Sequence, residues 1–243
     1  MGVNGDQSNN NVLGSGAAYV FVRNGATWTQ QAYLKPSNTG PGDQFGWSVA
    51  ISGDTIVVSS LLEDSASAGV NGNPFNQAAT DAGAAFVFVR SGTTWSQQAY
   101  LKSSNPGSLD YFGYSVAISG DTVVVGAWGE DSNATGVNAN QSDNTATESG
   151  AAYVFVRNGG VWSQQAYLKA SNTGAADRFG RAVAVAGDTV VVGAAFEDSN
   201  ATGVNGDGSN NSATRLGGGL CLRAEQDDLE PTGVPEGVEH GDQ

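Results

Sequence analysis

The chain contains 243 residues and carries a formal net charge of −14; it is rich in glycine (35 residues) and poor in charged side chains (14%). This acidic balance excludes nucleic acid as an expected partner, because phosphate binding needs clustered Lys and Arg. No apolar run approaches the length of a membrane span and Met1 is followed directly by polar residues, so we expect neither a membrane span nor a signal peptide in this chain.

A fixed period organises the chain. Phe45-Gly46, Phe112-Gly113 and Phe179-Gly180 lie 67 residues apart (112−45 and 179−112), and the surrounding sequence repeats in the same register. A constant period without insertions indicates that one supersecondary module is stacked on copies of itself. We expect each Phe of this motif to fill the core between neighbouring modules, with the glycine permitting a close approach.

Each module carries four strand signals. Val, Tyr, Phe, Trp and Thr dominate the predicted strands, while Gly, Asn, Asp and Ser dominate the joints. The dipeptide Gly53-Asp54 between two β-branched runs predicts a two-residue hairpin. In this module the strands are predicted at residues 48–52, 55–58, 84–90 and 95–102, with a long polar loop at 63–81.

Four antiparallel strands per module at a constant period are typical of a β-propeller blade; a solenoid or a β-sandwich is the alternative. We therefore predict an all-β fold, a partial (open-arc) β-propeller of four-stranded antiparallel blades built on this repeat. The alternating connections should place the tight turns on one face and the long loops on the other. Binding is expected on the long-loop face, because loops on a rigid scaffold carry function.

The copies predict a truncated array. It comprises a half blade at residues 1–35, blades at about 45–102 and 112–169, and a half blade at about 179–217. An open arc exposes an apolar blade face at each end, so we expect self-association through the end blades.

A separate tail is predicted at residues 218–243. Its residues can be encoded by codons that, read one base later, restore the next repeat, beginning with Tyr-Val-Phe-Val-Arg. We interpret the tail as a frameshifted reading and expect it to be disordered. The only Cys and the only His, Cys221 and His240, fall there, so neither is a candidate nucleophile or metal ligand.

The recurring motifs resemble a known family. Asp-x-Phe-Gly occurs at residues 43–46, 110–113 and 177–180, and Val-Val-Gly-Ala follows at 124–127 and 191–194. This pattern is similar to the FG-GAP repeat of integrin α subunits and of many bacterial surface proteins. The resemblance implies a propeller that binds a protein or glycan ligand, an extracellular or cell-surface location for the intact parent, and calcium. The Asp-x-Asp-x-Asp-Gly calcium loop of integrin blades is not present in that form.

Calcium is the one cofactor that the sequence suggests. Glu-Asp pairs open each long loop, and oxygen-bearing side chains alternate further along, as at Asn205, Asp207 and Ser209. A loop wraps a hard cation in this way, although each alternating stretch holds at most one carboxylate. The alternative is that these side chains solvate the loop and cap its turns. The candidate metal ligands are Glu63, Asp64, Glu130, Asp131, Glu197, Asp198, Asp6 and Asp207.

Positions at which the near-identical copies differ supply the candidate ligand-binding residues. They flank Phe-Gly and the mouth of the long loop. Packing would hold such positions alike, so their variation indicates exposure, and Trp, Tyr and Arg commonly anchor interfaces. Drift at tolerant surface positions is the alternative. The candidates are Trp47, Tyr114, Arg181, Tyr111, Arg178, Trp128 and Phe196.

Catalysis has little support in the sequence. The repeats contain no His, no Cys and no nucleophile elbow, and every carboxylate pair is a repeated feature. We therefore predict a non-catalytic adhesion or ligand-binding module with candidate calcium sites. The alternatives are the product of a truncated, frameshifted gene with no function of its own, and a carbohydrate-active propeller enzyme.

Overall fold

Strands are the only regular secondary structure in the computed structural model, which describes residues 2–210 and 213. In chain order they are β1 (Ala18–Asn24), β2 (Thr27–Leu34), β3 (Phe45–Ser52), β4 (Thr55–Ser60), β5 (Ala84–Ser91), β6 (Thr94–Leu101), β7 (Ser115–Ser119), β8 (Thr122–Ala127), β9 (Ala151–Asn158), β10 (Val161–Leu168), β11 (Phe179–Ala186) and β12 (Thr189–Ala194).

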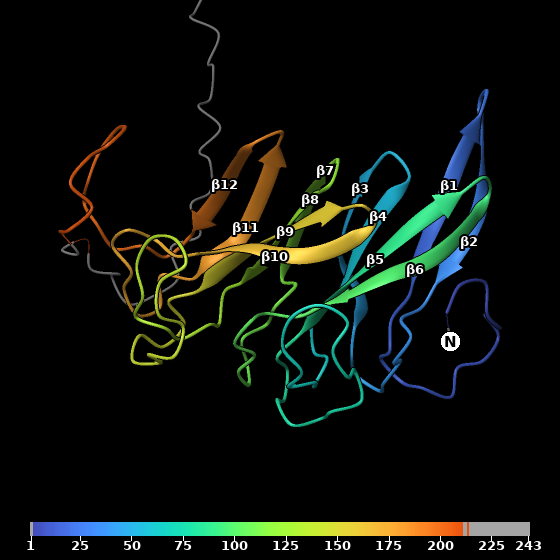
Figure 1. Cartoon of the computed structure of the whole chain (residues 1–243), viewed down its shortest axis with the longest axis horizontal. Helices are drawn as coiled ribbons and strands as arrows, with labels where there is room; N and C mark the ends of the chain where they lie inside the picture. The colour runs from blue at the N-terminus through green and yellow to red at the C-terminus, as the bar shows by residue number, and fades with distance from the viewer. Residues whose placement is uncertain (1, 211–212, 214–243) are drawn as a thin grey trace, which may run out of the picture. The chain divides into compact units, whose positions relative to one another are not determined.

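The strands are grouped as the repeat predicts. Two four-stranded antiparallel sheets have the orders β3-β4-β5-β6 and β7-β8-β9-β10, and β1-β2 and β11-β12 are two-stranded. Figure 1 shows these groups following one another in chain order. The all-β fold with four-stranded antiparallel sheets is confirmed, and its open, unclosed sheets fit part of a propeller.

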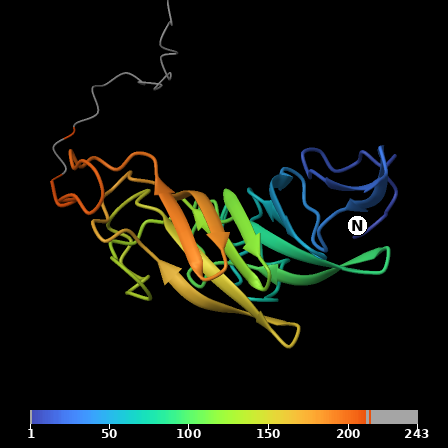
Figure 2. The same cartoon turned by 90° about the horizontal axis from the view of Figure 1, so that it is seen from above.

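The first strands of successive groups lie beside each other. β3 contacts β7, and β7 contacts β11. The Val116 N–H donates to Ser48 Oγ at 3.2 Å, and Ser115 Oγ donates to the Gly180 carbonyl at 2.9 Å, so hydrogen bonds join the groups along this line. Figure 2 shows from above that each group remains a separate sheet.

The Phe-Gly motif packs where two groups meet. Phe112 is fully buried, and its ring centroid lies 5.4 Å from that of Tyr153. Gly83, at the end of the preceding long loop, has φ +77° and approaches Phe112 so closely that a Cβ would lie 2.1 Å from the Phe112 carbonyl oxygen. The predicted core role of this Phe is confirmed, and Gly83 provides a second close approach that the sequence did not single out.

The first strand of the first complete blade begins earlier than predicted. β3 starts at Phe45 instead of residue 48, because a register shift between Phe45 and Val49 lets the motif join the sheet. A bulge of this kind bends a strand without ending it. Gly46, a residue type that is depleted in strands, masked the strand signal in the sequence.

Side chains at the outer strands join successive groups by the same hydrogen bond. Trp95 Nε1 donates to Gln31 Oε1 at 2.8 Å, and Trp162 Nε1 donates to Gln98 Oε1 at 2.7 Å. Both indole rings are buried, whereas Trp28, the copy of these residues in the first hairpin, is 63% exposed. The joint is therefore a repeated element of the fold.

Tight turns and long loops occupy opposite ends of the strands. In Figure 1 the turns of β3-β4, β7-β8 and β11-β12 point upward, and the long loops after β4 and β8 lie below. Among the described residues no helix is long and apolar enough to span a membrane. The predicted tail at 218–243, with Cys221 and His240, lies outside the residues that the structure describes.

Candidate functional site

The seven candidate ligand-binding residues form one connected surface. Each lies close to the beginning of a first strand or the end of a second strand, so all belong to the long-loop ends of the strands. We call this set the aromatic–arginine ladder; its members are Trp47, Tyr111, Tyr114, Trp128, Arg178, Arg181 and Phe196.

The aromatic part of the ladder crosses from the first blade to the second. The ring centroids of Trp47 and Tyr114 are 5.8 Å apart, and Trp47 Nε1 donates to the Tyr114 carbonyl at 3.2 Å. Tyr114 in turn meets Trp128 edge-on at 6.0 Å. Trp128 stacks on Tyr111 at 4.9 Å with an interplanar angle of 10°. The rings therefore form a continuous row of tilted, edge-on and stacked pairs, arrangements that aromatic groups favour.

Two arginines extend this row into the third copy. The guanidinium carbon of Arg178 lies 4.5 Å from the ring centroid of Trp128 and 4.9 Å from that of Phe196. Arg181 lies 5.8 Å from the centroid of Tyr114 and 4.9 Å from that of Phe196. Each cation–π contact of this kind contributes about 0.5–2 kcal/mol. The three copies thus hold each other's variable residues in place.

Backbone geometry fixes two members of the ladder. Tyr111 (φ 55°) and Arg178 (φ 58°) adopt the left-handed conformation, which is uncommon for residues other than glycine. The Tyr111 N–H donates to the Asp81 carbonyl at 3.2 Å, and the Arg178 N–H donates to the Glu148 carbonyl at 3.0 Å. Hydrogen bonds to the preceding long loop therefore hold these residues in a conformation that they rarely adopt alone.

The two arginines differ in charge compensation. Arg178 Nη2 lies 2.6 Å from Glu148 Oε2. No ion pair to Arg181 is found within residues 2–210 and 213. Arg181 therefore presents an uncompensated positive charge between the rings of Tyr114 and Phe196.

The expected exposure of the variable positions needs a correction. Trp47 is 49% exposed, but Tyr114, Trp128 and Arg181 are half-buried, and Leu61, the copy of Trp128 in the first blade, is buried. These variable residues contact one another across blade boundaries, which accounts for their partial burial.

Two candidate metal ligands are instead buried partners of lysine. Glu63 Oε2 lies 3.0 Å from Lys102 Nζ, and both side chains are almost completely inaccessible, at 1% and 0% exposure. Asn38 Nδ2 and Tyr100 OH donate to Glu63 Oε1 at 2.8 and 3.0 Å. The second blade repeats the arrangement, with Glu130 Oε2 2.9 Å from Lys169 Nζ. The charge of each glutamate is therefore already balanced within the blade.

The other candidate carboxylates shape the loops. Asp64 Oδ1 accepts from the Asp81 N–H at 2.9 Å, and Asp131 Oδ1 accepts from the Glu148 N–H at 2.8 Å. Three of the remaining carboxylates also accept local hydrogen bonds: Glu197 from Asn172, Asp6 from Ser8, and Asp207 from Ser209. At Asp198 the main-chain carbonyl accepts from the Ala213 N–H. The hydrogen bonds from Ser8 lower the pKa of Asp6.

These donor sets do not fit a calcium site. Within the described residues no group of three or more His, Cys, Asp or Glu side chains could hold a metal ion. Calcium usually takes six to eight oxygen ligands, so dispersed and already bonded carboxylates are a poor match. Calcium binding stays a prediction; a rise in melting temperature with Ca²⁺ that a chelator reverses would support it.

One buried hydrogen bond of the second blade has no counterpart in the first blade, and this difference predicts an effect on stability. Tyr153 OH donates to Asn105 Oδ1 at 2.7 Å, but its copy in the first blade is Phe86, and the buried Asn38 Oδ1 finds no hydrogen-bond partner among the described residues. We expect Phe86→Tyr to raise the free energy of unfolding by about 1 kcal/mol, because it supplies the missing donor. Urea denaturation measures the change. The reverse substitution, Tyr153→Phe, should cost about 1–2 kcal/mol; destabilisation by Phe86→Tyr would contradict the assignment.

Asp110 predicts a dependence of stability on pH. Its pKa is raised from the ordinary value of 3.8 to about 7, chiefly by burial and also by the charges of Glu130 and Asp131, against a lowering hydrogen bond from Gly107 and the charge of Lys102. Since the folded state binds this proton more tightly than the unfolded chain, the stabilisation is complete below about pH 4 and is lost as the pH rises through about 7.

Asp110→Asn removes this titration while keeping an acceptor for Gly107. The difference in unfolding free energy between the variant and the unchanged chain should grow in favour of the variant as the pH rises from 5 to 8. We expect this growth to be on the order of 2 kcal/mol. Urea denaturation at several pH values measures this difference. Parallel pH profiles of the two proteins would contradict the raised pKa.

Sequence reasoning missed Lys102, Lys169 and Glu148. The two lysines recur at the repeat spacing, as do Glu63 and Glu130. In a chain with few charged residues, a Lys and a Glu that both recur at the repeat spacing could have indicated that each Lys pairs with a Glu. Glu148 is the copy of Asp81, which lies 67 residues earlier (148−81), so an acid that recurs at the end of the long loop is the corresponding signal for it.

The repeated sheets and their joints define an all-β repeat protein whose architecture fits part of a β-propeller. A model of the FG-GAP repeat matches residues 28–88, 95–155 and 162–210, which together exceed half of the chain. The chain therefore belongs to the FG-GAP repeat family, and the resemblance noted in the sequence is confirmed. Comparison with curated proteins finds no match.

Proposed function

We propose that this chain is a non-catalytic ligand-binding module of a cell-surface or secreted protein, and that the aromatic–arginine ladder is its binding surface. The observation that carries the proposal is the continuity of the ladder through three copies that are otherwise nearly identical. Membership of the FG-GAP family supports an integrin-α-like role in adhesion and an extracellular location.

The composition of the ladder favours a protein or glycan ligand. Half-exposed Trp47 offers a flat apolar face that can stack on a sugar ring or an apolar side chain. Arg181 offers a charge that no carboxylate of the described residues neutralises, and it can donate two parallel hydrogen bonds to a carboxylate. Trp, Tyr and Arg are also the residues most enriched at the energetic centres of interfaces.

The assignment of a non-catalytic role has a structural argument. The best-placed carboxylates, Glu63 and Glu130, are held by lysines in the blade interior instead of facing a surface. General acid–base catalysis needs such groups within reach of a substrate proton. These two glutamates therefore serve the fold in our proposal.

Ligand screening with ladder variants tests this function. The full chain is applied to arrays of immobilised glycans and proteins, and each ligand found is measured again with Trp128→Ala and Arg181→Ala. We expect each substitution to weaken binding about 30-fold, which corresponds to about 2 kcal/mol at an interface centre. Circular dichroism confirms that the variants are folded.

Phe75→Ala is the matched control. Phe75 is 69% exposed and belongs to none of the ring pairs formed by residues 2–210, so its loss should leave binding unchanged. A ligand that binds equally well to both ladder variants would overturn the assignment of the surface. Failure of the folded chain to bind any arrayed protein or glycan would favour a product without a function of its own.

A further inference from the structure

The first and last hairpins each leave one backbone edge unpaired. Within the described residues β1 pairs only with β2, and β12 pairs only with β11. In the complete sheets the equivalents of these strands pair with each other, as β8 does with β9 and β4 with β5. An unpaired edge is a template for another strand, and the two edges here are complementary copies of an established pair.

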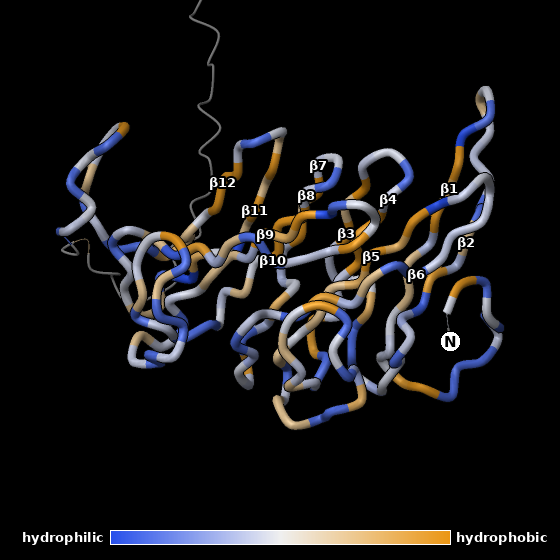
Figure 3. The backbone as a smooth tube through the Cα atoms, viewed as in Figure 1, coloured by the Kyte–Doolittle hydropathy of each residue, from blue (hydrophilic) through white to orange (hydrophobic). Residues whose placement is uncertain are grey.

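Apolar side chains accompany both edges. Tyr19 and Phe21 in β1 are each 53% exposed, and Val191 in β12 is 63% exposed. Their copies in the complete blades, such as Phe86, Phe88 and Val124, are fully buried. Figure 3 shows hydrophobic stretches along the strands at both ends of the array. Within residues 2–210, the end hairpins therefore carry the apolar surface of a blade without its covering strands.

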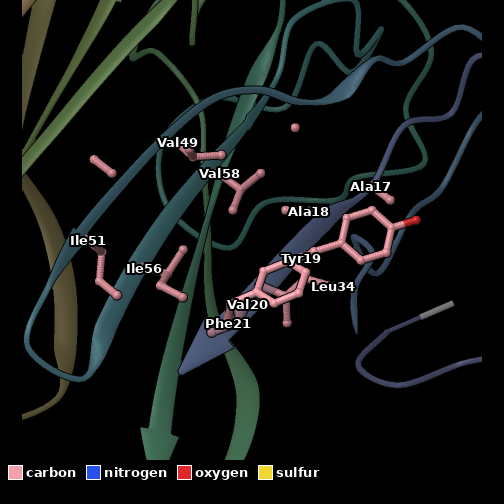
Figure 4. A pocket seen from close by; sticks show the side chains of 12 residues that line it. Ala17, Ala18, Tyr19, Val20, Phe21, Leu34, Val49, Ile51, Ile56 and Val58 are labelled. Carbon is pink, nitrogen blue, oxygen red and sulfur yellow. The ribbon is translucent and has the colours of Figure 1, made fainter. Parts of the chain in front are cut away.

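A pocket marks the place of the absent strands at the first hairpin. It has a volume of about 340 Å³ and lies between β1 and the pair β3-β4, with Tyr19 and Phe21 on one side and Val49 and Ile51 on the other (Figure 4). Between the two complete groups the equivalent space is filled, because β7 packs on β3 and β4. A β11-β12 hairpin has the shape and apolar surface to fill it.

Polar groups at the two ends are also complementary. In the second blade Asp121 pairs with Arg157; the copies of these residues are Asp188 beside β12 and Arg23 in β1. Glu130 likewise pairs with Lys169, and the corresponding copies are Glu197 and Lys35. One end thus holds the acids and the other holds the bases.

We propose that two copies of this chain complete each other's half blades, with β12 of one copy pairing antiparallel with β1 of the other. The register follows from Val123 opposite Phe155 and Val124 opposite Val154, which places Val190 opposite Phe21 and Val191 opposite Val20. Asp188 then meets Arg23 of the other copy, and Glu197 meets Lys35. Strand addition of this kind gains main-chain hydrogen bonds as well as apolar burial.

Reciprocal pairing closes the assembly. The described part of each chain forms two complete blades and two half blades. A pair of chains in which the half blades complete each other therefore holds six blades, within the range of about four to eight found in propellers. A head-to-tail contact forms a ring when its rotation closes and a filament when it does not. Residues 202–210 nearly repeat residues 1–9, and the Asn4 N–H already donates to the Tyr33 carbonyl. In the dimer, residues 1–9 therefore keep their place beside β2, and residues 202–210 of the other copy lie elsewhere.

Molar mass in solution tests the assembly. Light scattering on the full chain should give twice the chain mass of 24.7 kDa. Val191→Lys should give a monomer with unchanged circular dichroism, because Val191 is exposed in the single chain but would be buried in the shared blade. Val161→Lys, at a 70% exposed position in a complete blade, is the control and should remain a dimer.

Disulfide trapping tests the register. In a Cys221→Ser background, Val20→Cys combined with Val191→Cys should form a covalent dimer on mild oxidation, because strand partners lie within disulfide range. Val20→Cys with Val190→Cys is the off-register control and should cross-link far less. A monomeric full chain, or equal cross-linking of both pairs, would overturn the pairing; a ladder of larger cross-linked species would overturn the closed ring.

Discussion

Lys102→Met is expected to lower the free energy of unfolding by about 3–5 kcal/mol, because it leaves the Glu63 carboxylate buried without its counter-charge. Lys102 Nζ also donates to the Gly83 carbonyl at 2.6 Å, so the substitution removes a donor from a second buried group. Burial lowers the pKa of Lys102, and the charge of Glu63 opposes that shift. The ammonium group is therefore held in the interior by its partner.

The double variant Glu63→Gln/Lys102→Met separates pairing from packing. Removing both charges should recover much of the loss, because no uncompensated ion remains in the blade. Urea denaturation of the two single variants and the double variant gives the coupling free energy. Additive losses would show that the two side chains stabilise the blade independently and would contradict the prediction.

Gly83→Ala is expected to destabilise the chain by about 3–5 kcal/mol through left-handed backbone strain and a forced displacement of the next blade. The new Cβ would lie 2.1 Å from the Phe112 carbonyl oxygen and 2.9 Å from that of Leu61. Both obstacles are backbone atoms, so no side-chain rotation relieves the contact. Thermal or urea denaturation measures the loss.

Gly92→Ala separates strain from contact. Gly92 has φ +61°, but nothing lies within 4 Å of a Cβ built there. This substitution should cost only about 1 kcal/mol, the strain of the left-handed conformation alone. Equal losses at Gly83 and Gly92 would show that the close approach to Phe112 does not limit the packing of blades.

The fold could be predicted because its information is local and repeated. The Gly53-Asp54 hairpin and the runs around Val57 and Val87 each specify a strand or a turn within a few residues, and three copies reduce the ambiguity of any single one. The bulge after Phe45 escaped prediction, since it depends on how the motif meets β4.

The candidate site could be predicted only in part. Differences between copies identified the members of the ladder, but they did not indicate that Tyr114 contacts both Trp47 and Arg181. Contacts between copies depend on how the blades pack, and the sequence of a single copy does not specify that packing. The carboxylates of Glu63 and Glu130 were singled out for their chemistry, and their burial against lysine depends on tertiary packing.

The recurring hydrogen bond from an outer-strand tryptophan to the glutamine of the previous group has a consequence for the number of repeats that a chain can contain. Trp95 and Trp162 each reach back 64 residues for the acceptor, so the same hydrogen bond joins the outer strands at both seams. Duplicating or deleting one whole unit of 67 residues leaves each remaining pair of outer strands with a tryptophan donor and a glutamine acceptor. At the outer strands, a change in copy number by whole units therefore requires no compensating substitution.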